Sequence, residues 1–346
     1  MEAVNAKTRK LLLGIDLGTS RTMIMSNRGA KETVRTVVGY PKDIIGVKIL
    51  NRTSVFGDDA LAKRSYMNLF FPLHDGVLKE ASERDTEAAR ELLQHVISLA
   101  NPQPDDEVYG ILGVPARASE ANKLQLLKIT DGLMDLAMVI SEPFMVAYGL
   151  NKLTNAIVID IGAGTVDICV MRGTIPAPDD QLTLLKAGNF INEVLSNAIS
   201  EAYPDVQMTP LLAEKIKEGH GFVGEPHQKA VVTLRSKGKP VPHDLTAEIR
   251  IACESVVPEI LEGIKRLVTR IDPEDQEESL RNIILAGGGS RLVGLDQMLA
   301  EGLREYGEVS VSRVTDADYA GSAGALKLAT ELPSEYWSQV GETTHG

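Results

Sequence analysis

One short pattern occurs twice in the chain, and each time it follows an apolar run. Residues 9–16 and 156–160 are both typical of buried strands that end on an aspartate. After each aspartate come glycine, a hydroxyl residue and a second apolar run. The two copies lie about one domain length apart, which predicts two halves of like design. Strands alternate with helical segments through most of the chain, so we expect an α/β protein.

Hydrophobic periodicity and turn residues predict the remaining elements. Further strands are expected at 22–26, 32–38, 108–114, 138–141, 166–171 and 282–286. Helices are expected at 85–99, 118–137, 142–152, 188–202, 209–218, 243–271, 292–305 and 319–331. Pro258 should kink or interrupt the longest of these helices. The segment 334–346 is polar apart from Tyr336 and Trp337, and we expect it to be loosely held.

Composition excludes several classes of protein. The chain has 48 acidic and 36 basic side chains and a net charge of −12, which does not suit a nucleic-acid-binding surface. Cys169 and Cys253 are too few for a disulfide framework, which favours a cytoplasmic location. The first residues show no apolar signal core, and no run of 18 apolar residues occurs, so no membrane span is expected.

Three glycine-rich turns follow apolar strands, at 14–20, 160–165 and 286–290. Without Cβ atoms, such turns let backbone N–H groups approach a phosphate closely. A P-loop, a complete dinucleotide fingerprint and a nucleophile elbow are all absent from the sequence. Asp16 and Asp160 stand beside two of these turns and suit Mg²⁺ held largely through water, although aspartate also commonly caps turns. The histidines show no zinc-ligand spacing.

Five motifs in order along residues 9–330 resemble those of the actin/Hsp70/sugar-kinase superfamily. The segments similar to its phosphate 1, phosphate 2 and adenosine motifs are 16–20, 160–167 and 285–290. Those similar to its two connecting helices are Glu142-Pro143 with Ala147 and Gly149, and 319–325. Segments 72–77 and 213–217 resemble bacterial actins of the MreB type. Further similarity to the magnetosome-associated branch of these actins lies at 37–43, 114–119 and 331–337.

The resemblance implies a fold and a domain plan. The fold is the actin-like, ribonuclease H-like duplicated ATPase fold, with nucleotide in the cleft between two domains. Domain I is expected at 1–141, with a small subdomain at about 33–75 and the final helix 319–332 packed back on it. Domain II is expected at 142–318, with a small subdomain at about 187–245. Residues 333–346 would form a polar C-terminal tail.

The resemblance also implies a role for each matching residue. Glu142 would orient the attacking water and Asp160 would act with it in catalysis, whereas without the resemblance Glu142 is simply an acid favoured at a helix N-terminus. Mg²⁺ would lie near Asp16 and Asp160, held through water. The residues expected to bind ATP or ADP are Asp16, Gly18, Thr19, Ser20, Asp75, Gly162, Ala163, Gly164, Thr165, Glu214, Lys217, Gly287, Gly288, Gly289 and Ser290.

The function implied is that of an ATP-hydrolysing cytoskeletal protein. It would polymerise with itself into cytoplasmic filaments that organise magnetosomes into chains, with magnetosome-associated proteins as partners. We expect no nucleic-acid partner, given the acidic net charge. We also expect no direct membrane insertion, because the N-terminus lacks the amphipathic segment of membrane-binding MreB proteins. The alternatives are a sugar or acid kinase of the same superfamily, and another bacterial actin, either MreB-like or a paralogue of the magnetosome branch.

Overall fold

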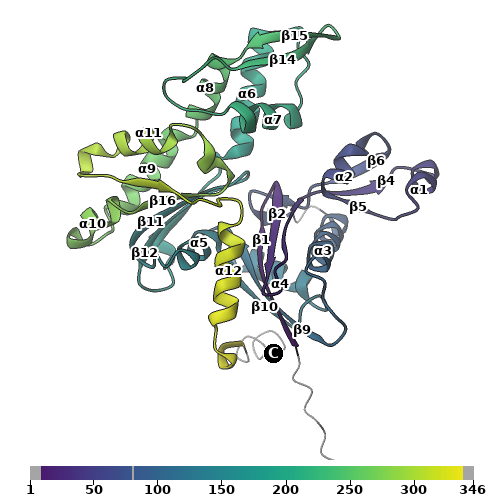
Figure 1. Cartoon of the computed structure of the whole chain (residues 1–346), viewed down its shortest axis with the longest axis horizontal. Helices are drawn as coiled ribbons and strands as arrows, with labels where there is room; N and C mark the ends of the chain where they lie inside the picture. The colour runs from purple at the N-terminus through teal and green to yellow at the C-terminus, as the bar shows by residue number, and fades with distance from the viewer. Residues whose placement is uncertain (1–8, 80–81, 338–346) are drawn as a thin grey trace, which may run out of the picture. The chain divides into compact units, whose positions relative to one another are not determined.

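The computed structural model describes residues 9–79 and 82–337 and divides the chain into two compact units (Figure 1). Unit 1 comprises Met1–Asn151 and Asp318–Gly346, and unit 2 comprises Lys152–Ala317. The chain therefore passes between the units only twice, at 151–152 and at 317–318. The helix that begins at Glu142 lies in unit 1, whereas the sequence placed the boundary in front of it.

A five-stranded mixed sheet forms the centre of unit 1. Its order is β10–β9–β1–β2–β3, in which β1, β2 and β3 are successively antiparallel and β9 and β10 continue parallel to β1. The central strand β1 buries Leu11, Leu13 and Ile15 completely, as the apolar run predicts. The strands are β1 (Arg9–Leu17), β2 (Arg21–Ser26), β3 (Lys31–Arg35), β9 (Asp106–Val114) and β10 (Leu136–Ser141).

The sheet of unit 2 repeats this topology. Its order is β13–β12–β11–β16–β17, with β11, β12 and β13 successively antiparallel and β16 and β17 parallel to β11. Strand β11 therefore takes the place of β1, which confirms the prediction of two halves of like design. The strands are β11 (Thr154–Ile161), β12 (Val166–Arg172), β13 (Gln181–Leu184), β16 (Ile283–Ala286) and β17 (Val311–Arg313).

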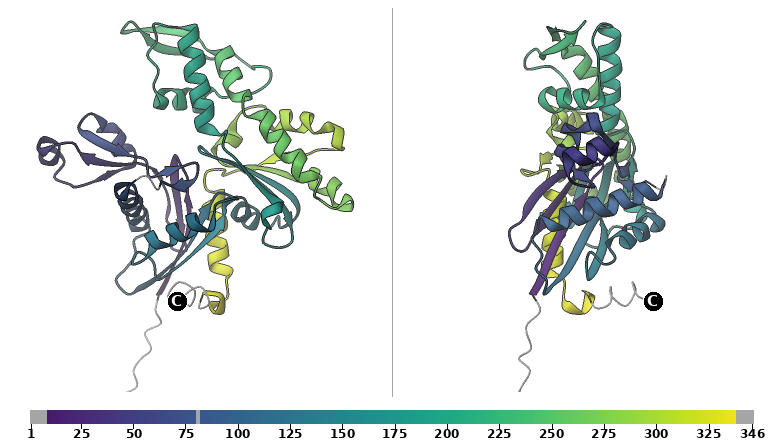
Figure 2. Two further views of the ribbon diagram at one scale, coloured as in Figure 1. Left: turned by 180° about the vertical axis from the view of Figure 1, so that it is seen from behind. Right: turned by 90° about the vertical axis from the view of Figure 1, so that its right-hand side faces the viewer.

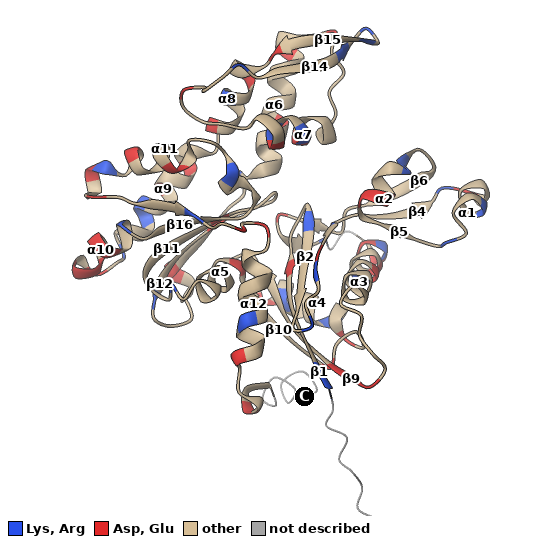
Figure 3. Ribbon diagram, viewed as in Figure 1, with Lys and Arg blue, Asp and Glu red and all other residues tan. Residues whose placement is uncertain are grey.

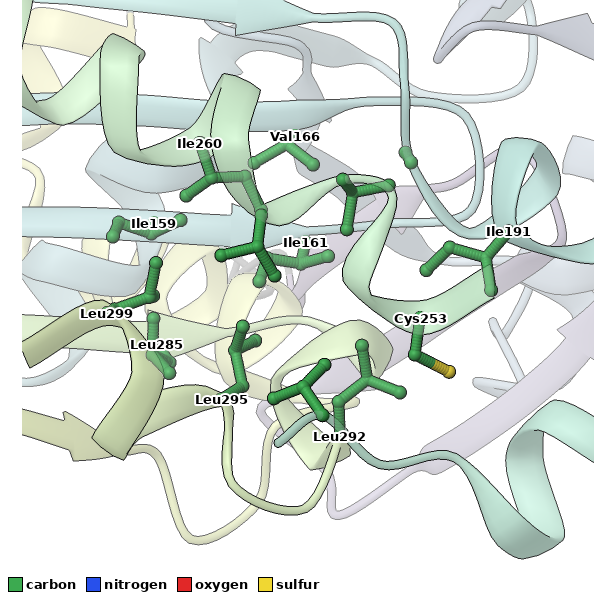
Figure 4. Packing of buried hydrophobic residues seen from close by; sticks show 14 of the residues in the cluster. Ile159, Ile161, Val166, Ile191, Cys253, Ile260, Leu285, Leu292, Leu295 and Leu299 are labelled. Carbon is green, nitrogen blue, oxygen red and sulfur yellow. The ribbon is translucent and has the colours of Figure 1, made fainter. Parts of the chain in front are cut away.

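Helices cover the sheet of unit 2 with one apolar core. Figure 4 shows side chains from three strands and several helices meeting in this cluster, which includes Ile159, Ile161, Ile191, Cys253, Ile260, Leu285 and Leu299. The helices of the unit are α6 (Gly188–Ala202), α7 (Pro210–His220), α8 (Thr246–Glu254), α9 (Val257–Val268), α10 (Pro273–Leu280) and α11 (Leu295–Gly302). Sequence periodicity did not predict α10, because half of its residues are acidic and only Ser279 and Leu280 are buried.

Each unit also carries a small lobe beside its main sheet. In unit 1 this lobe is a three-stranded sheet in the order β5–β4–β6 with two short helices. In unit 2 the hairpin β14–β15 joins α6, α7 and α8 (Figure 1). The bounds are β4 (Val38–Pro41), α1 (Ile44–Leu50), β5 (Val55–Phe56), α2 (Gly57–Ala62), β6 (Met67–Phe70), β14 (Val231–Ser236) and β15 (Lys239–Asp244).

The strand predicted at 32–38 is wrong as a single element. Strand β3 ends at Arg35, and β4 begins at Val38 in the sheet of the small lobe. Thr36 causes the break, because its N–H donates to Ser20 O at 2.9 Å and its buried hydroxyl donates to Gly18 O at 2.7 Å. These bonds hold Thr36 against the β1–β2 turn and redirect the chain into the lobe.

One predicted helix is shorter than expected and another is divided. The helix predicted at 118–137 is α4 (Glu120–Thr130), since Gly132 adopts a φ of 69° and Asp135 accepts the N–H of Val108 at 2.7 Å. The helix predicted at 243–271 is divided into α8 and α9. Pro258 stands in the first turn of α9, where proline is tolerated, so the predicted interruption is confirmed.

The described start of the C-terminal segment, up to Trp337, is held more firmly than its polar sequence predicts. Trp337 is 3% exposed, and its ring centroid lies 5.2 Å from that of Tyr109 on β9. The expectation of a loosely held segment is therefore wrong for this residue, because one large apolar side chain anchors it. Residues 1–8 and 338–346 lie outside the described residues. Within the part of the chain that is described, no helix has the length and apolarity to cross a membrane.

Helix α12 (Ala320–Glu331) packs on β1 and α5 (Glu142–Gly149) with its backbone (Figures 1 and 2). A Cβ on Gly324 would lie 1.8 Å from Met145 O. A Cβ on Gly14 of β1 would lie 2.1 Å from Ser322 O. Such distances exclude any side chain, so these glycines are required for the close approach of the three elements.

We expect Gly324→Ala to destabilise unit 1 by about 1–3 kcal/mol, the usual cost of overpacking, and so to lower the melting temperature by several degrees. Gly219→Ala is the matched control, because Gly219 also lies in a helix but no atom lies within 4 Å of its added Cβ. That variant should be neutral or stabilised by up to about 1 kcal/mol. Thermal unfolding followed by circular dichroism measures both, and equal melting temperatures would contradict the packing argument.

Candidate functional site

In unit 1 the predicted aspartate lies where β1 ends. Asp16 is opposite Met23 on β2 and Gly113 on β9, and its carboxylate lies over the first turn of α12. A Cβ on Gly321 would be 2.5 Å from Asp16 Oδ2, so the glycine leaves space that the carboxylate fills. The N-terminal turn of a helix favours a negative charge. The sequence predicted Gly321 as part of a connecting helix but gave it no role toward Asp16.

The β1–β2 turn is held from one side. Its Gly18 carbonyl accepts the hydroxyl of Thr36 at 2.7 Å, and the Thr36 hydroxyl lies 3.0 Å from that of Thr22. A trans peptide places each C=O opposite the next N–H, so the Thr19 N–H points away from Thr36. This orientation presents the Thr19 N–H on the other side of the turn, where a backbone donor to an anion is required.

Asp75 lies on a hairpin that touches this turn. The hairpin joins β7 (Leu73–His74) to β8 (Val77–Leu78), with φ of 49° at Asp75 and 73° at Gly76, the backbone of a type I′ turn. The Gly76 N–H donates to Thr19 Oγ1 at 2.8 Å. This bond brings together segments 16–20 and 72–77, which lie apart in the sequence and both contain predicted site residues.

Glu142 is the first residue of α5 and packs close to Gly113. A Cβ on Gly113 would lie 3.1 Å from Glu142 Cγ, and Gly113 is also the β9 partner of Asp16. Glu142 and Asp16 therefore lie on either side of the same glycine at the ends of β1 and β9. The structure thus brings two of the predicted site residues, Glu142 and Asp16, to the same glycine.

In unit 2 the second aspartate has the same kind of setting. Asp160 lies at the end of β11 opposite Ala286 of β16 and is 8% exposed. A Cβ on Gly287 would be 2.3 Å from Asp160 Oδ1, and the φ of Gly287 is 71°. Gly287 was expected to bind nucleotide as part of the adenosine motif, but its lack of a side chain is already required by the Asp160 carboxylate.

The turn after β11 is fixed by the start of α6. Gly162 O accepts the N–H of Gly188 at 3.1 Å and Ala163 O accepts the N–H of Asn189 at 2.7 Å. By the same peptide geometry, the N–H groups of Ala163 and Gly164 point away from α6. Two successive donors on one side form the concave arrangement that binds phosphate oxygens. Thr165 closes the turn by accepting the Gly162 N–H at 2.8 Å.

The predicted adenosine-side residues lie on two separate elements of unit 2. Glu214 and Lys217 are three apart on α7, which places them on one face of the helix. Lys217 Nζ donates to Gly188 O at 2.9 Å, which ties α7 to the start of α6. Ser290 is 1% exposed and donates its hydroxyl to Gly287 O at 2.7 Å, so it closes the short 3₁₀ turn Gly288–Arg291.

Sequence reasoning gave no role to Asp167, although it quoted the residue within the second phosphate motif. Asp167 is opposite Asp160 across β11 and β12, is 1% exposed, and accepts the hydroxyl of Thr183 at 2.6 Å. The equivalent position in unit 1 is Met23. The signal was present, because 160 and 167 stand symmetrically about a tight hairpin turn and must face each other.

Comparison with known proteins agrees with this geometry. The family model described as MreB/Mbl protein matches residues 10–333. Actin-like protein MamK of Paramagnetospirillum magneticum is 52% identical over 98% of this chain and 97% of its own length. The solved MamK double helical filament is 51% identical with a TM-score of 0.92, covering 94% of this chain and 100% of that one. A non-polymerising MamK mutant bound to AMPPNP has the same identity and coverage with a TM-score of 0.74.

The duplicated sheets and their paired aspartate–glycine turns define an actin-like protein, as the sequence predicted. The chain belongs to the MreB/Mbl family. Within that family its similarity is to MamK, over nearly the full length of both chains. The resemblance to this branch of bacterial actins, predicted from 37–43, 114–119 and 331–337, is confirmed.

We expect Gly287→Ala to disturb Asp160 directly. The added Cβ meets the carboxylate and also forces alanine into a positive φ, so the melting temperature should fall by roughly 5 °C or more. Amide hydrogen exchange should rise in 160–165. Gly307→Ala is the control, because Gly307 has a φ of 129° but nothing within 4 Å of its Cβ. If both variants behave alike, backbone strain alone explains the effect and the Asp160 contact is irrelevant.

Proposed function

We propose that this chain is an ATP-binding, ATP-hydrolysing bacterial actin that polymerises into filaments. The observation that carries the proposal is the duplicated half-site, in which each unit ends its central strand on an aspartate lodged against a glycine. Its support includes 51% identity to a MamK double helical filament and to an AMPPNP-bound MamK mutant. In the proposed cell biology the filaments are cytoplasmic and organise magnetosomes, with magnetosome-associated proteins as partners.

The two turns would bind the phosphates of ATP. Thr19 in unit 1 and Ala163 with Gly164 in unit 2 have backbone N–H groups directed away from the elements that hold the turns. These donors suit the β- and γ-phosphate oxygens. On α7, Glu214 and Lys217 would lie toward the ribose and purine. Gly287→Ala would then lower affinity for Mg²⁺–ATP as well as stability, because it displaces Asp160.

Mg²⁺ fits the carboxylates of Asp16 and Asp160. Each carboxylate occupies space that a Cβ on the neighbouring glycine would otherwise fill. A larger residue in place of that glycine would therefore displace the carboxylate. Among residues 9–79 and 82–337, no cluster of three or more His, Cys, Asp or Glu side chains suits a metal ion. Magnesium usually keeps several waters and takes few protein ligands. Bound there, it would neutralise charge that develops on the transferred phosphoryl group.

Glu142 is proposed to orient the attacking water. It lies across Gly113 from Asp16, which places a hydrogen-bond acceptor beside the phosphate turn of unit 1. Phosphoryl transfer depends mainly on positioning and charge neutralisation. One water oriented by Glu142, together with backbone N–H groups of the turns that donate to the phosphates, is therefore sufficient for slow ATP hydrolysis.

The experiment that tests the function is sedimentation with electron microscopy of the purified chain in Mg²⁺ with ATP, with ADP and without nucleotide. We expect filaments with ATP and fewer with ADP, because the γ-phosphate adds differential contacts to the assembling state. Thin-layer chromatography should show free phosphate as product. Monomers under all three conditions, together with phosphate transferred to an added sugar or acid, would favour the kinase alternative.

Glu142→Gln should slow ATP hydrolysis by roughly 10- to 1000-fold, the range for loss of a positioned general base. Binding of ATP and filament assembly should survive, because the amide keeps the shape of the side chain. Glu120→Gln is the matched control, since Glu120 is also an acid in the first turn of a helix of unit 1 but is largely exposed. If Glu142→Gln hydrolyses ATP at the wild-type rate, Glu142 has no role in the mechanism.

A further inference from the structure

A hollow lies where the small lobe of unit 1 meets the helix α3 (Glu83–Ser98). Its volume is about 450 Å³, which is within the range of small-molecule sites. Its walls come from residues 52–56 of the lobe, from Asp59 on α2 and from His95 on α3. None of these residues belongs to the predicted nucleotide site, so the hollow has no role in the function proposed above.

Two stacked rings form one wall of the hollow. The imidazole of His95 lies parallel to the ring of Phe56, with the centroids 4.3 Å apart and the planes at 8°. Leu92 and Val96 of the same helix are completely buried, so α3 cannot rotate to turn His95 away from the lobe. Burial lowers the pKa of His95. The ring is therefore neutral at neutral pH and offers one N–H donor.

The polar groups that line the hollow are not used by the protein itself. The guanidinium of Arg52 has no hydrogen-bond or ion-pair partner among residues 9–79 and 82–337. The same holds, within the described part of the chain, for the hydroxyls of Thr53 and Ser54 and for the imidazole nitrogens of His95. Four neighbouring groups that donate hydrogen bonds are thus available to a ligand.

The charge of the hollow is opposite to that of the chain. Asp59 is the one acid among the described lining residues, and it already pairs with Lys63. Its neighbour Asp58 pairs with Arg35 at 3.2 Å. Arg52 therefore stays uncompensated in a chain whose net charge is −12. Figure 3 shows basic residues in the lobe around α1 and β5, and acidic residues on α2 and α3.

We propose that this hollow binds a small metabolite that carries a phosphate group. Arginine can bond two phosphate oxygens at once, and the hydroxyls of Thr53 and Ser54 and the N–H of His95 can reach the remaining lone pairs. A carboxylate has one oxygen fewer and would use less of this donor set. The hollow is larger than a phosphate group, and Phe56 gives the organic part of the ligand an apolar ring surface. The site is additional to the proposed ATP site.

The first test measures binding while the ATP site is filled. Calorimetric titration of the full chain with glycerol 3-phosphate, in saturating Mg²⁺–ADP, should give a dissociation constant of about 1 mM or lower. Arg52→Gln should weaken binding about ten- to hundredfold, because it removes a charged donor. Arg64→Gln is the matched control, since Arg64 is also an exposed arginine of the lobe but does not line the hollow. The control should bind within about twofold of the wild type.

A second test reports on the hollow itself. The Cε1–H NMR signal of His95 can be identified by its absence in His95→Phe, a variant that keeps a ring for stacking on Phe56 but has no N–H. Glycerol 3-phosphate should shift this signal in the wild type and in Arg64→Gln, but not in Arg52→Gln. His95→Phe should itself bind about 2- to 10-fold more weakly, the range for one hydrogen bond. Both arginine variants should keep the wild-type melting temperature, because these side chains are exposed.

The outcomes are independent of filament assembly. If Arg52→Gln binds glycerol 3-phosphate as the wild type does, or if the His95 signal does not move at about 10 mM ligand, the site is wrong even when the chain polymerises. Glycerate, with a carboxylate in place of the phosphate, should bind about fivefold more weakly or worse, and equal or tighter binding would overturn the assignment to phosphate. Inorganic phosphate should also bind more weakly, and equal affinity would overturn the assignment to a phosphorylated metabolite.

Discussion

The structure depends on a carboxylate that fits against a glycine in each unit. Asp16 lies over Gly321 and Asp160 over Gly287, at distances where a Cβ would collide with the carboxylate oxygens. Both aspartates stand at the end of a central strand, so the sheets hold the acids and the glycines hold the space around them. Duplication explains why both aspartates have the same setting, since the two sheets have the same strand order and direction.

The two units differ in the residues that surround Asp16 and Asp160. Opposite Asp16 stands Met23, whereas opposite Asp160 stands a second buried carboxylate, Asp167, with Thr183 as its donor. The turn of unit 1 is held by the hydroxyl of Thr36, and that of unit 2 by the N-terminus of α6. Glu142 follows the strand β10 of unit 1, and its counterpart position in unit 2 belongs to no predicted catalytic residue.

Much of the fold was predictable because the strands at 9–17 and 154–161 are apolar throughout and end on turn residues. The glycine turns and the resemblance supplied the candidate site. What failed depends on long-range contacts. The break at Thr36 needs the β1–β2 turn, and the burial of Trp337 needs Tyr109 on β9. The role of Gly321 toward Asp16 joins segments far apart in sequence, which periodicity does not detect. The hairpin β14–β15 fully buries only Leu234, so its apolar content was too low to indicate strands.

The same kind of contact connects Asp16 with the places where the chain leaves unit 1. Helix α12 begins just after the crossing at 317–318, and α5 ends just before the crossing at 151–152. The two helices meet backbone to backbone at Gly324, and α12 also touches Asp16 through Gly321. Because these glycine contacts leave no flexible side chain between the groups, Asp16, α12 and α5 pack as one close-fitting set. The set lies beside both places where the chain leaves unit 1, so a substitution at Gly321 or Gly324 would disturb the packing next to both crossings.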